Sequence, residues 1–271
     1  MIGASREALA AGRQNLESLT DNTSVDSAKL AEELSSVTTL LDREVSLRRV
    51  LTDPSRSGQD KAQLASSLLA GQVSGEAVDL VSGLVRSRWS GARDLVDSVE
   101  QLSAYAEVIA AEKAGRLDEL EDELFRFGRI VSGSHELRAA LTEPKADSAT
   151  KAALVAKLLG GRALPGTVRL VTSLVANPRG RSLELGLESY AKLAADRRER
   201  VVALVTTAVP LSDSQKARLE GALGRLYGRA VLLNIDVDPE VVGGVRVQIG
   251  DEIIDGTVSS RLEGARQALE G

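Results

Sequence analysis

The chain repeats part of itself at a constant distance. The segment Leu-Arg-Arg-Val-Leu-Thr-Asp-Pro at 47–54 returns as Leu-Arg-Ala-Ala-Leu-Thr-Glu-Pro at 137–144, ninety positions later. A shared Leu-Thr-acid-Pro turn in constant register is not expected by chance, even between leucine-rich helices. The pattern indicates a duplicated domain, so the fold has to contain two similar units. The same separation relates 61–64 to 151–154, 68–71 to 158–161 and 80–85 to 170–175, and it places Leu30, Glu33 and Leu34 on Leu120, Glu123 and Leu124.

Each copy is predicted to be a small helical bundle. Apolar residues between 28 and 51 recur at three- and four-residue steps, which is typical of an amphipathic helix. Pro54 ends this run, because the residue before a proline resists helical geometry, and Gly71 is a natural terminator of the next helix. Aromatic residues are only 2% of the sequence, which favours helix-on-helix cores of Leu, Val, Ile and Ala. The expected helices are 5–19, 28–51, 60–69 and 76–86 in the first copy, and 94–110, 118–141, 151–159 and 167–175 in the second.

The last part of the chain changes period. A helix predicted over 183–200 runs into 201–209, which is apolar on both faces and therefore resembles a covered strand. Ser212 and Gln215 form a capping box for a helix to Tyr227, and 231–237 alternates as a second strand. A hairpin follows at 245–255, entered through Pro239 and the pair Gly243-Gly244, with a tight turn at Gly250-Asp251. A closing helix is expected over 258–269.

We therefore expect a mainly α protein with a small α+β C-terminal module. Two tandem helical bundles precede a β-α-β-β-β-α unit in this prediction, with the sheet covered by two helices. The predicted domains are 1–92, 93–195 and 196–271.

Composition excludes several classes of function. The formal net charge of −5 argues against a protein that binds nucleic acid through a wide basic face. The chain has no cysteine, which removes disulfides, thiolate metal sites and cysteine nucleophiles. The N-terminal residues show no signal-peptide pattern, and no window approaches the roughly 20 apolar residues of a membrane-spanning helix. We expect a cytosolic protein that meets a membrane only through partners.

The candidate chemical residues favour structural interpretations. The single histidine, His135, corresponds to Val45 in the first copy, so a shared catalytic role is excluded. The acidic run 118–123 spreads its carboxylates around a helix instead of converging them on a cation. Trp89 is interpreted either as an exposed contact residue or as packing beneath the next bundle.

The glycine-rich segments do not predict a nucleotide site. The segment 221–228 lacks the spacing of a phosphate-binding or dinucleotide-binding loop. Gly243-Gly244 precedes a strand instead of a helix N-terminus, so it lacks the geometry that cradles phosphate. The sequence therefore predicts no catalytic residue, no metal site and no cofactor. What remains is a set of amphipathic helices suited to holding other chains.

Two C-terminal motifs resemble a known family. The first is Thr-Thr-Ala-Val-Pro-Leu at 206–211, which contains Pro210. The second is the hairpin signature with Gly-Gly-Val-Arg-Val at 243–247 and Ile-Asp-Gly-Thr-Val at 254–258. In this order and separation they resemble the F-type ATP synthase delta subunit family, to which the mitochondrial oligomycin-sensitivity-conferring protein belongs. The likeness covers nearly all of 94–271, and its signature positions with a structural role are Pro210, Pro239, Gly243, Gly244, Gly250, Asp255 and Gly256.

The resemblance implies a non-catalytic stator subunit of the peripheral stalk, on the cytoplasmic face of the bacterial cell membrane. In this family the helical bundle binds N-terminal helices of the alpha subunits, and the C-terminal part engages the C-terminal helix of the b subunit. The family's alpha-binding groove lies between the first and fifth helices of the bundle. By position, the partner-binding residues would include Leu80 and Leu84 in the first copy and Leu170 and Leu174 in the second. The same leucines are equally suited to the core.

The extra bundle departs from the family pattern, because the usual member has one. It is expected either to grip a second alpha N-terminus or to extend the contact with the b subunit. The alternative function is a helical adaptor or scaffold that binds amphipathic helices of partners unrelated to energy conversion.

Overall fold

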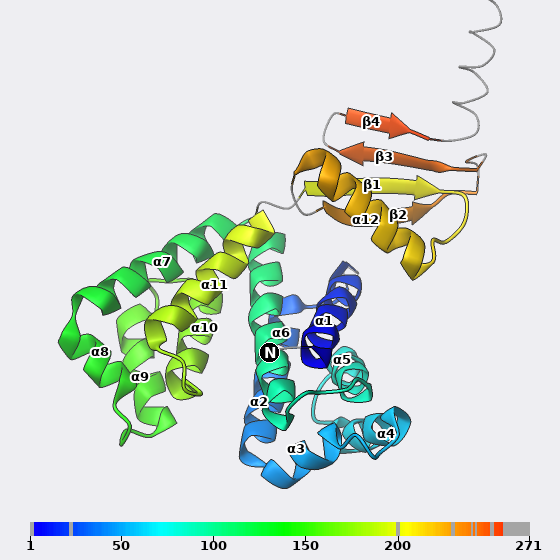
Figure 1. Cartoon of the computed structure of the whole chain (residues 1–271). Coiled ribbons are helices and arrows are strands. Elements are labelled where there is room, and N and C mark those ends of the chain that lie inside the picture. Colours follow the sequence, from blue (N-terminus) through cyan, green and yellow to red (C-terminus); the bar gives the residue numbers. More distant parts are fainter. Residues whose placement is uncertain are drawn as a thin grey trace, which may run out of the picture. The chain divides into compact units, whose positions relative to one another are not determined.

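The structure is a computed structural model, and it describes residues 3–21, 24–198, 201–228, 231–239, 241, 243–249 and 252–256. Contacts between Cα atoms divide the chain into two compact units, Met1–Ala195 and Asp196–Gly271. The first unit is helical and the second carries the sheet (Figure 1). The mainly α fold with a small α+β module is confirmed.

The first copy of the repeat contributes five helices before a long helix that follows it. Their bounds are α1 (Ala4–Asp21), α2 (Ser27–Arg43), α3 (Val45–Thr52), α4 (Gly58–Leu69) and α5 (Gly75–Arg86), followed by α6 (Ala92–Lys113). The remaining helices of this part are α7 (Leu117–Gly133), α8 (His135–Thr142), α9 (Ser148–Leu159), α10 (Pro165–Ala176) and α11 (Leu183–Arg198). Every bound of α2 to α5 returns ninety residues later in α7 to α10, so the sequence repeat is also a repeat of structure.

The sequence predicted one long helix over each of the ranges 28–51 and 118–141. This prediction is wrong in one respect, because each range is broken into two helices. The first break falls at Glu44, whose φ of −93° and ψ of 79° leave the helical region. Arg48 stabilises the corner, since its Nη1 donates to the carbonyl oxygen of Leu41 at 3.1 Å. The second break falls at Ser134, whose hydroxyl accepts from the amide of Leu137 at 3.2 Å and so caps the next helix. Because each range holds two helices, α5 is the fifth helix of the first copy, counted from α1, and α10 is the fifth helix of the second copy, counted from α6.

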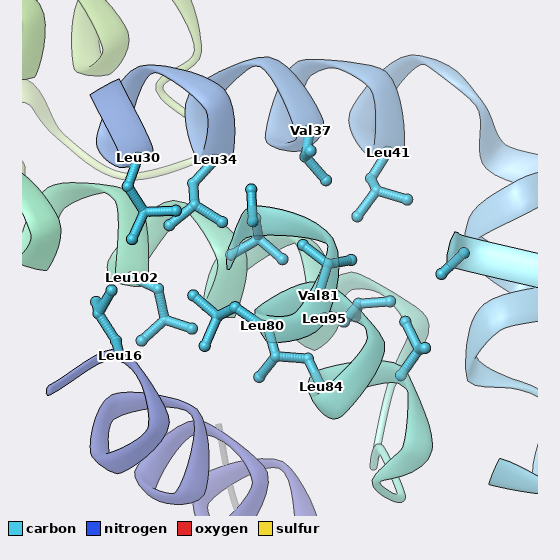
Figure 2. Close-up of a cluster of buried hydrophobic side chains, with 14 of the residues drawn as sticks. Leu16, Leu30, Leu34, Val37, Leu41, Leu80, Val81, Leu84, Leu95 and Leu102 are labelled. Atoms are coloured by element: carbon cyan, nitrogen blue, oxygen red, sulfur yellow. The ribbon is translucent and has the colours of Figure 1, made fainter. Parts of the chain in front are cut away.

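Helix α6 takes part in both helical cores. Its residues Leu95, Val99 and Leu102 are fully buried in the first core, whereas Ala104 and Val108 are buried in the second. In Figure 1 this 22-residue helix runs between the first-copy helices and the group from α7 to α11. It therefore closes the first bundle and opens the second. Figure 2 shows the first core, in which one face of α2 meets α1, α5 and α6 through Leu16, Leu30, Leu34, Val37, Leu41, Leu80, Val81, Leu84, Leu95 and Leu102.

A glutamate joins the second helix of each copy to the start of the fifth. Glu33 accepts from the hydroxyl of Ser74 at 2.5 Å. Its counterpart Glu123 accepts from the amide of Leu164 at 2.9 Å and from the hydroxyl of Thr167 at 2.5 Å. A carboxylate next to a helix N-terminus is favoured by the helix dipole. The repeat therefore preserves an interaction as well as a set of helix lengths.

The second unit contains a four-stranded mixed sheet and a helix. Its elements are β1 (Val201–Thr207), α12 (Asp213–Tyr227), β2 (Val231–Val237), β3 (Val245–Ile249) and β4 (Glu252–Asp255). The strand order is β2-β1-β3-β4, with β1 parallel to β2 and the other pairs antiparallel. The capping box of Ser212 and Gln215 is present. Ala203, Val205 and Leu223 are buried between sheet and helix.

The prediction of a strand covered on both faces over 201–209 is wrong. The strand ends at Thr207, and Leu204 and Val209 are 48% and 65% exposed. Ala203, Val205 and Thr207 are buried instead, so burial alternates along the strand. Among the described residues, α12 supplies the helical cover of this sheet.

The family-signature positions shape the hairpin. Gly243 and Gly244 have φ of 65° and 87°, a region that glycine enters without steric cost. Asp255 on β4 pairs with Arg246 on β3 at 3.1 Å. Gly256 donates its amide to Val245 O at 2.9 Å. Pro210 follows β1 and Pro239 lies in the turn after β2. Gly250 and the helix expected over 258–269 lie outside the described residues.

Candidate partner-binding site

A groove of about 530 Å³ lies where α6 and α10, the first and fifth helices of the second copy, meet α2 and α9. Small side chains line much of it, including Ala31, Ala104, Ala149 and Ala152. Small residues allow the backbone of another helix to approach closely. Larger apolar contributions come from Val168 and Leu170. Its apolar lining is compatible with contact to the apolar face of a helix.

One end of the groove carries an ion pair with a buried carboxylate and a half-buried arginine. Arg169 donates to both carboxylate oxygens of Glu107, at 2.5 and 2.8 Å, and approaches Glu32 of the first copy at 3.2 Å. The Glu107 side chain is 4% exposed. Burial raises the pKa of Glu107 above its usual value, while the guanidinium of Arg169 opposes that change. The pair therefore ties α10 to α6 and α2 along one edge of the groove.

The other end carries a second network around Glu100, whose side chain is 3% exposed. Arg179 lies 3.0 Å from Glu100 Oε2, and Arg181 lies 2.5 Å from Glu100 Oε1. The hydroxyl of Tyr190 donates to the same Oε1 at 3.1 Å. Arg179 also approaches Asp42 on α2 at 3.8 Å. These ionic contacts link the α10–α11 loop of the second copy to helices that build the first.

The four leucines expected to bind partners lie in the two hydrophobic cores. Leu80 and Leu84 are 1% and 2% exposed in the first core. Leu170 and Leu174 are 3% and 1% exposed in the second. In the structure these side chains pack helices together, and Leu170 also reaches the wall of the groove. Partner contact by these side chains stays a prediction.

The corresponding helices of the first copy, α1 and α5, approach closely. A Cβ built on Gly12 of α1 would lie 2.7 Å from Leu84 Cδ2 and 3.1 Å from Leu102 Cδ1. A side chain at this position would force the Leu84 side chain to shift and would crowd Leu102, so the glycine favours the close approach. The bounds of the fifth helices, α5 and α10, repeat at ninety residues, whereas those of the first helices, α1 and α6, do not.

The remaining candidate residues have structural positions. His135 is exposed at the start of α8. The indole of Trp89 donates to the carbonyl oxygen of Leu84 at 3.0 Å and packs against the first core. In the acidic run, Asp122 pairs with Arg126 and Glu119 pairs with Arg116. No group of three or more His, Cys, Asp or Glu side chains suited to a metal ion occurs within the described residues.

The ionic residues at both ends of the groove were not predicted from the sequence. Glu100 and Arg179 are separated by 79 positions, and Glu107 and Arg169 by 62. One signal was available in the helix 94–110, where two glutamates fall among apolar positions. Their partners lie in distant segments, so only the folded arrangement identifies them. None of the helices in the part of the chain that the structure describes is long and apolar enough to cross a membrane.

Comparisons with known proteins agree with the family resemblance. A family model described as ATP synthase delta (OSCP) subunit matches residues 99–269. The chain is 64% identical over 271 residues to ATP synthase subunit delta of Streptomyces griseus, covering 100% of both chains. It is 65% identical over 269 residues to the protein of that name from Streptomyces coelicolor, covering 99% of this chain and 98% of the relative.

More distant proteins match as well. ATP synthase subunit delta of Thermobifida fusca is 47% identical over 271 residues, covering 100% of both chains. These relatives therefore extend over the first bundle, most of which precedes the residues that the family model matches. A chain from the cryo-EM structure of the Toxoplasma gondii mitochondrial ATP synthase hexamer is 22% identical, with 62% of this chain and 95% of that chain covered. Its TM-score of 0.29 is too low to compare the folds.

Proposed function

The chain belongs to the ATP synthase delta (OSCP) subunit family, and we propose that its α6–α10 groove receives the N-terminal helix of an alpha subunit. Family membership makes it a structural, non-catalytic subunit of the peripheral stalk, associated with other ATP synthase subunits and peripheral to the membrane sector. As a stator it links the catalytic head to the membrane sector and resists rotor torque. The same membership decides against the unrelated adaptor or scaffold.

The observation that carries the proposal is the groove between the first and fifth helices of the second copy. It measures about 530 Å³ and is lined by alanines, Val168 and Leu170. An amphipathic helix buries its apolar stripe in such a groove and needs no chemical reaction to stay bound. The charged pairs at the two ends, Glu107 with Arg169 and Glu100 with Arg179, give the groove polar limits.

The construction of the two bundles suits a part that carries torque. Helix α6 supplies buried residues to both cores, so the bundles cannot turn about a flexible linker without breaking a core. Arg169 and Arg179 add ion pairs from the second copy to Glu32 and Asp42 on α2. A stiff connection transmits force with little displacement, which is the mechanical requirement of a stator.

We propose the remaining partner contacts from what is typical of the family. The C-terminal unit, residues 196–271, engages the C-terminal helix of the b subunit. The first bundle, residues 1–92 closed by α6, either holds a second alpha N-terminus or extends the contact with b. The protein acts on the cytoplasmic face of a bacterial membrane through these partners. Residues 93–195 are then the bundle that corresponds to the single bundle of the usual family member.

Calorimetry of the full chain with an alpha N-terminal peptide tests the groove. Ala152→Glu places a carboxylate in the groove wall, whereas Ala153→Glu makes the same change on an exposed neighbouring position outside it. We expect Ala152→Glu to weaken binding at least about tenfold, because a charge would be buried against an apolar stripe. Equal affinities of the two variants would reject this groove as the alpha site.

The stoichiometry of the same titration decides the role of the first bundle. Cutting the chain at residue 92 would remove α6 from the first core, so the intact chain is used. Two peptides per chain, reduced to one by Ala152→Glu, would support a second alpha site in the first bundle. One peptide per chain, reduced to none, would favour the extended contact with b.

A further inference from the structure

A second groove, of about 430 Å³, lies between α7 and α11 on the second copy. Phe125, Gly128 and Arg129 line it from α7, and Leu187, Glu188 and Ala191 line it from α11. It shares no lining residue with the groove between α6 and α10. It is also formed by the second and closing helices of the bundle, instead of the first and fifth.

The repeat shows what this surface does in the first copy. Phe125 and Arg129 correspond, ninety residues earlier, to Ser35 and Thr39 on α2. Both of those residues face the α9–α10 pair of the second copy across the larger groove. In the first copy this helical face is therefore flanked by two helices, which form the opposite wall of the larger groove. In the second copy the same face lines the α7–α11 groove, and no such pair of helices flanks it among the described residues.

The helices that close the two bundles, α6 and α11, also correspond to each other. The buried positions Leu183, Leu187, Tyr190 and Ala194 of α11 have the same spacing as Leu95, Val99, Leu102 and Ala106 of α6. This alignment places Glu188 at the position of Glu100. Glu100 forms ion pairs with Arg179 and Arg181 of the α10–α11 loop. Glu188 is exposed, and no partner for it lies within the described residues.

The α7–α11 face carries an exposed aromatic side chain that the corresponding face of the first copy lacks. Phe125 is 58% exposed in a chain that has only two phenylalanines, and it replaces the serine of the first copy. An exposed aromatic side chain beside a groove is typical of an anchor for a partner.

The charges beside the groove specify the partner. The neighbouring pairs Asp122–Arg126 and Glu184–Arg138 are satisfied within the chain. Arg129 on the α7 side and Glu188 on the α11 side have no ion pair among the described residues. A bound helix would therefore carry an acidic residue along one edge of its apolar stripe and a basic residue along the other.

A second copy of this chain is a poorer occupant. Helices α9 and α10 already flank the corresponding face of the first copy in their own chain. Arg169, and Arg179 next to them, form ion pairs with α2 there. The α9–α10 face is therefore not free to enter the α7–α11 groove of another copy. We propose that the α7–α11 groove is a separate docking site for one amphipathic helix of another polypeptide, with an apolar stripe flanked by one acidic and one basic edge. Phe125 is its apolar anchor, and Glu188 receives a basic side chain as Glu100 does.

Synthetic peptides and the full chain test this proposal. The first peptide has about five helical turns, roughly 18 residues, with a leucine stripe between one acidic and one basic edge. The second has the same stripe between two basic edges. Fluorescence anisotropy measures binding of each peptide to the wild type, to Phe125→Ser and to Leu68→Ser. Leu68 on α4 is 45% exposed and provides a matched loss of an exposed apolar side chain elsewhere.

We expect the mixed-edge peptide to bind the wild type, with Phe125→Ser weakening it about tenfold or more and Leu68→Ser having no effect. Arg129→Glu would make both edges of the groove acidic and reverse the preference toward the doubly basic peptide. Equal binding by wild type and Phe125→Ser would overturn the proposal, as would binding that Ala152→Glu removes. Sedimentation equilibrium that shows a dimer sensitive to Phe125→Ser would also overturn it, because the occupant would then be a second copy.

Discussion

Leu174 of α10 rests its side chain directly on Gly186 of α11. A Cβ built on Gly186 would overlap both methyl carbons of Leu174 and lie 3.0 Å from its Cγ. Leu174 is 1% exposed, so any shift of its side chain has to be accommodated within the core. The contact sets how closely the fifth and last helices of the second bundle approach.

Gly186→Ala should therefore destabilise the chain by about 1–3 kcal/mol, the usual cost of forcing an extra methyl group into a packed core. Gly133→Ala is the matched control, because a Cβ there meets nothing within 4 Å. The control should be neutral or slightly stabilising, since it restricts the unfolded chain. Urea unfolding followed by circular dichroism measures both. A Gly186→Ala protein as stable as wild type would show that Leu174 can repack.

Glu123 and Glu33 offer a comparison between the two copies. The N-terminus of α10 has no side-chain cap of its own, and Glu123 supplies the acceptor for Leu164 and Thr167. Helix α5 is capped by Ser74, which accepts from the amide of Ala77. Glu123→Ala should thus cost about 1–3 kcal/mol, because it leaves buried donors without an acceptor.

The matched substitution Glu33→Ala should cost less, about 1 kcal/mol, since Ser74 still caps its helix. Denaturant titrations of the two variants give both values. Equal losses of stability would mean that the Ser74 cap contributes little and that Glu33 and Glu123 stabilise their copies equally.

Arg179 joins the two copies, and its own backbone is strained. Its φ of 49° is unusual for a residue other than glycine, and its side chain is 5% exposed beside Asp42, Asp97 and Glu100. Arg179→Met removes the cation and leaves buried carboxylates less compensated, which should destabilise the chain by about 3–5 kcal/mol. Arg181→Met, at a side chain 33% exposed, should cost clearly less. Thermal unfolding ranks the two, and the reverse order would contradict this assignment.

The sequence predicted the parts of the fold that are encoded locally. Pro54 and Gly71 mark helix ends, and Ser212 with Gln215 marks a helix start, because each acts on its own backbone. The ninety-residue register made the second copy predictable from the first. The break at Glu44 was missed, since the apolar stripe continues across it and the corner is held by Arg48.

The double burial of α6 could not be predicted from its pattern. Ala, Ser and Glu positions along this helix look like a solvated face, yet Ser98, Ala104 and Glu107 are buried. Their burial depends on a second bundle that lies against the first. The groove and its ionic ends have the same origin, because Glu100 and Arg179 meet only after both copies fold.

Tyr190 gives the network around Glu100 a signature at alkaline pH. The side chain is 3% exposed, and burial, followed by the neighbouring Glu100 carboxylate, raises the pKa of Tyr190 well above its unfolded value of 10.0. A pKa raised by folding means that the native state holds the phenolic proton more tightly. The stability linked to it is therefore complete below pH 10 and is lost as the pH rises through the folded pKa.

In the wild type, the part of the unfolding free energy that is linked to the Tyr190 proton falls by about 1.4 kcal/mol for each pH unit above 10. Tyr190→Phe cannot titrate, so its stability relative to wild type should increase with that slope above pH 10. Below pH 9 the variant should be less stable by about 1 kcal/mol, because Glu100 loses the hydrogen bond from the hydroxyl. Guanidinium unfolding of both proteins between pH 8 and about pH 11 measures the difference and cancels the titration of shared lysines. A difference independent of pH across this range would mean that the Tyr190 hydroxyl ionises as freely in the folded chain as in the unfolded one.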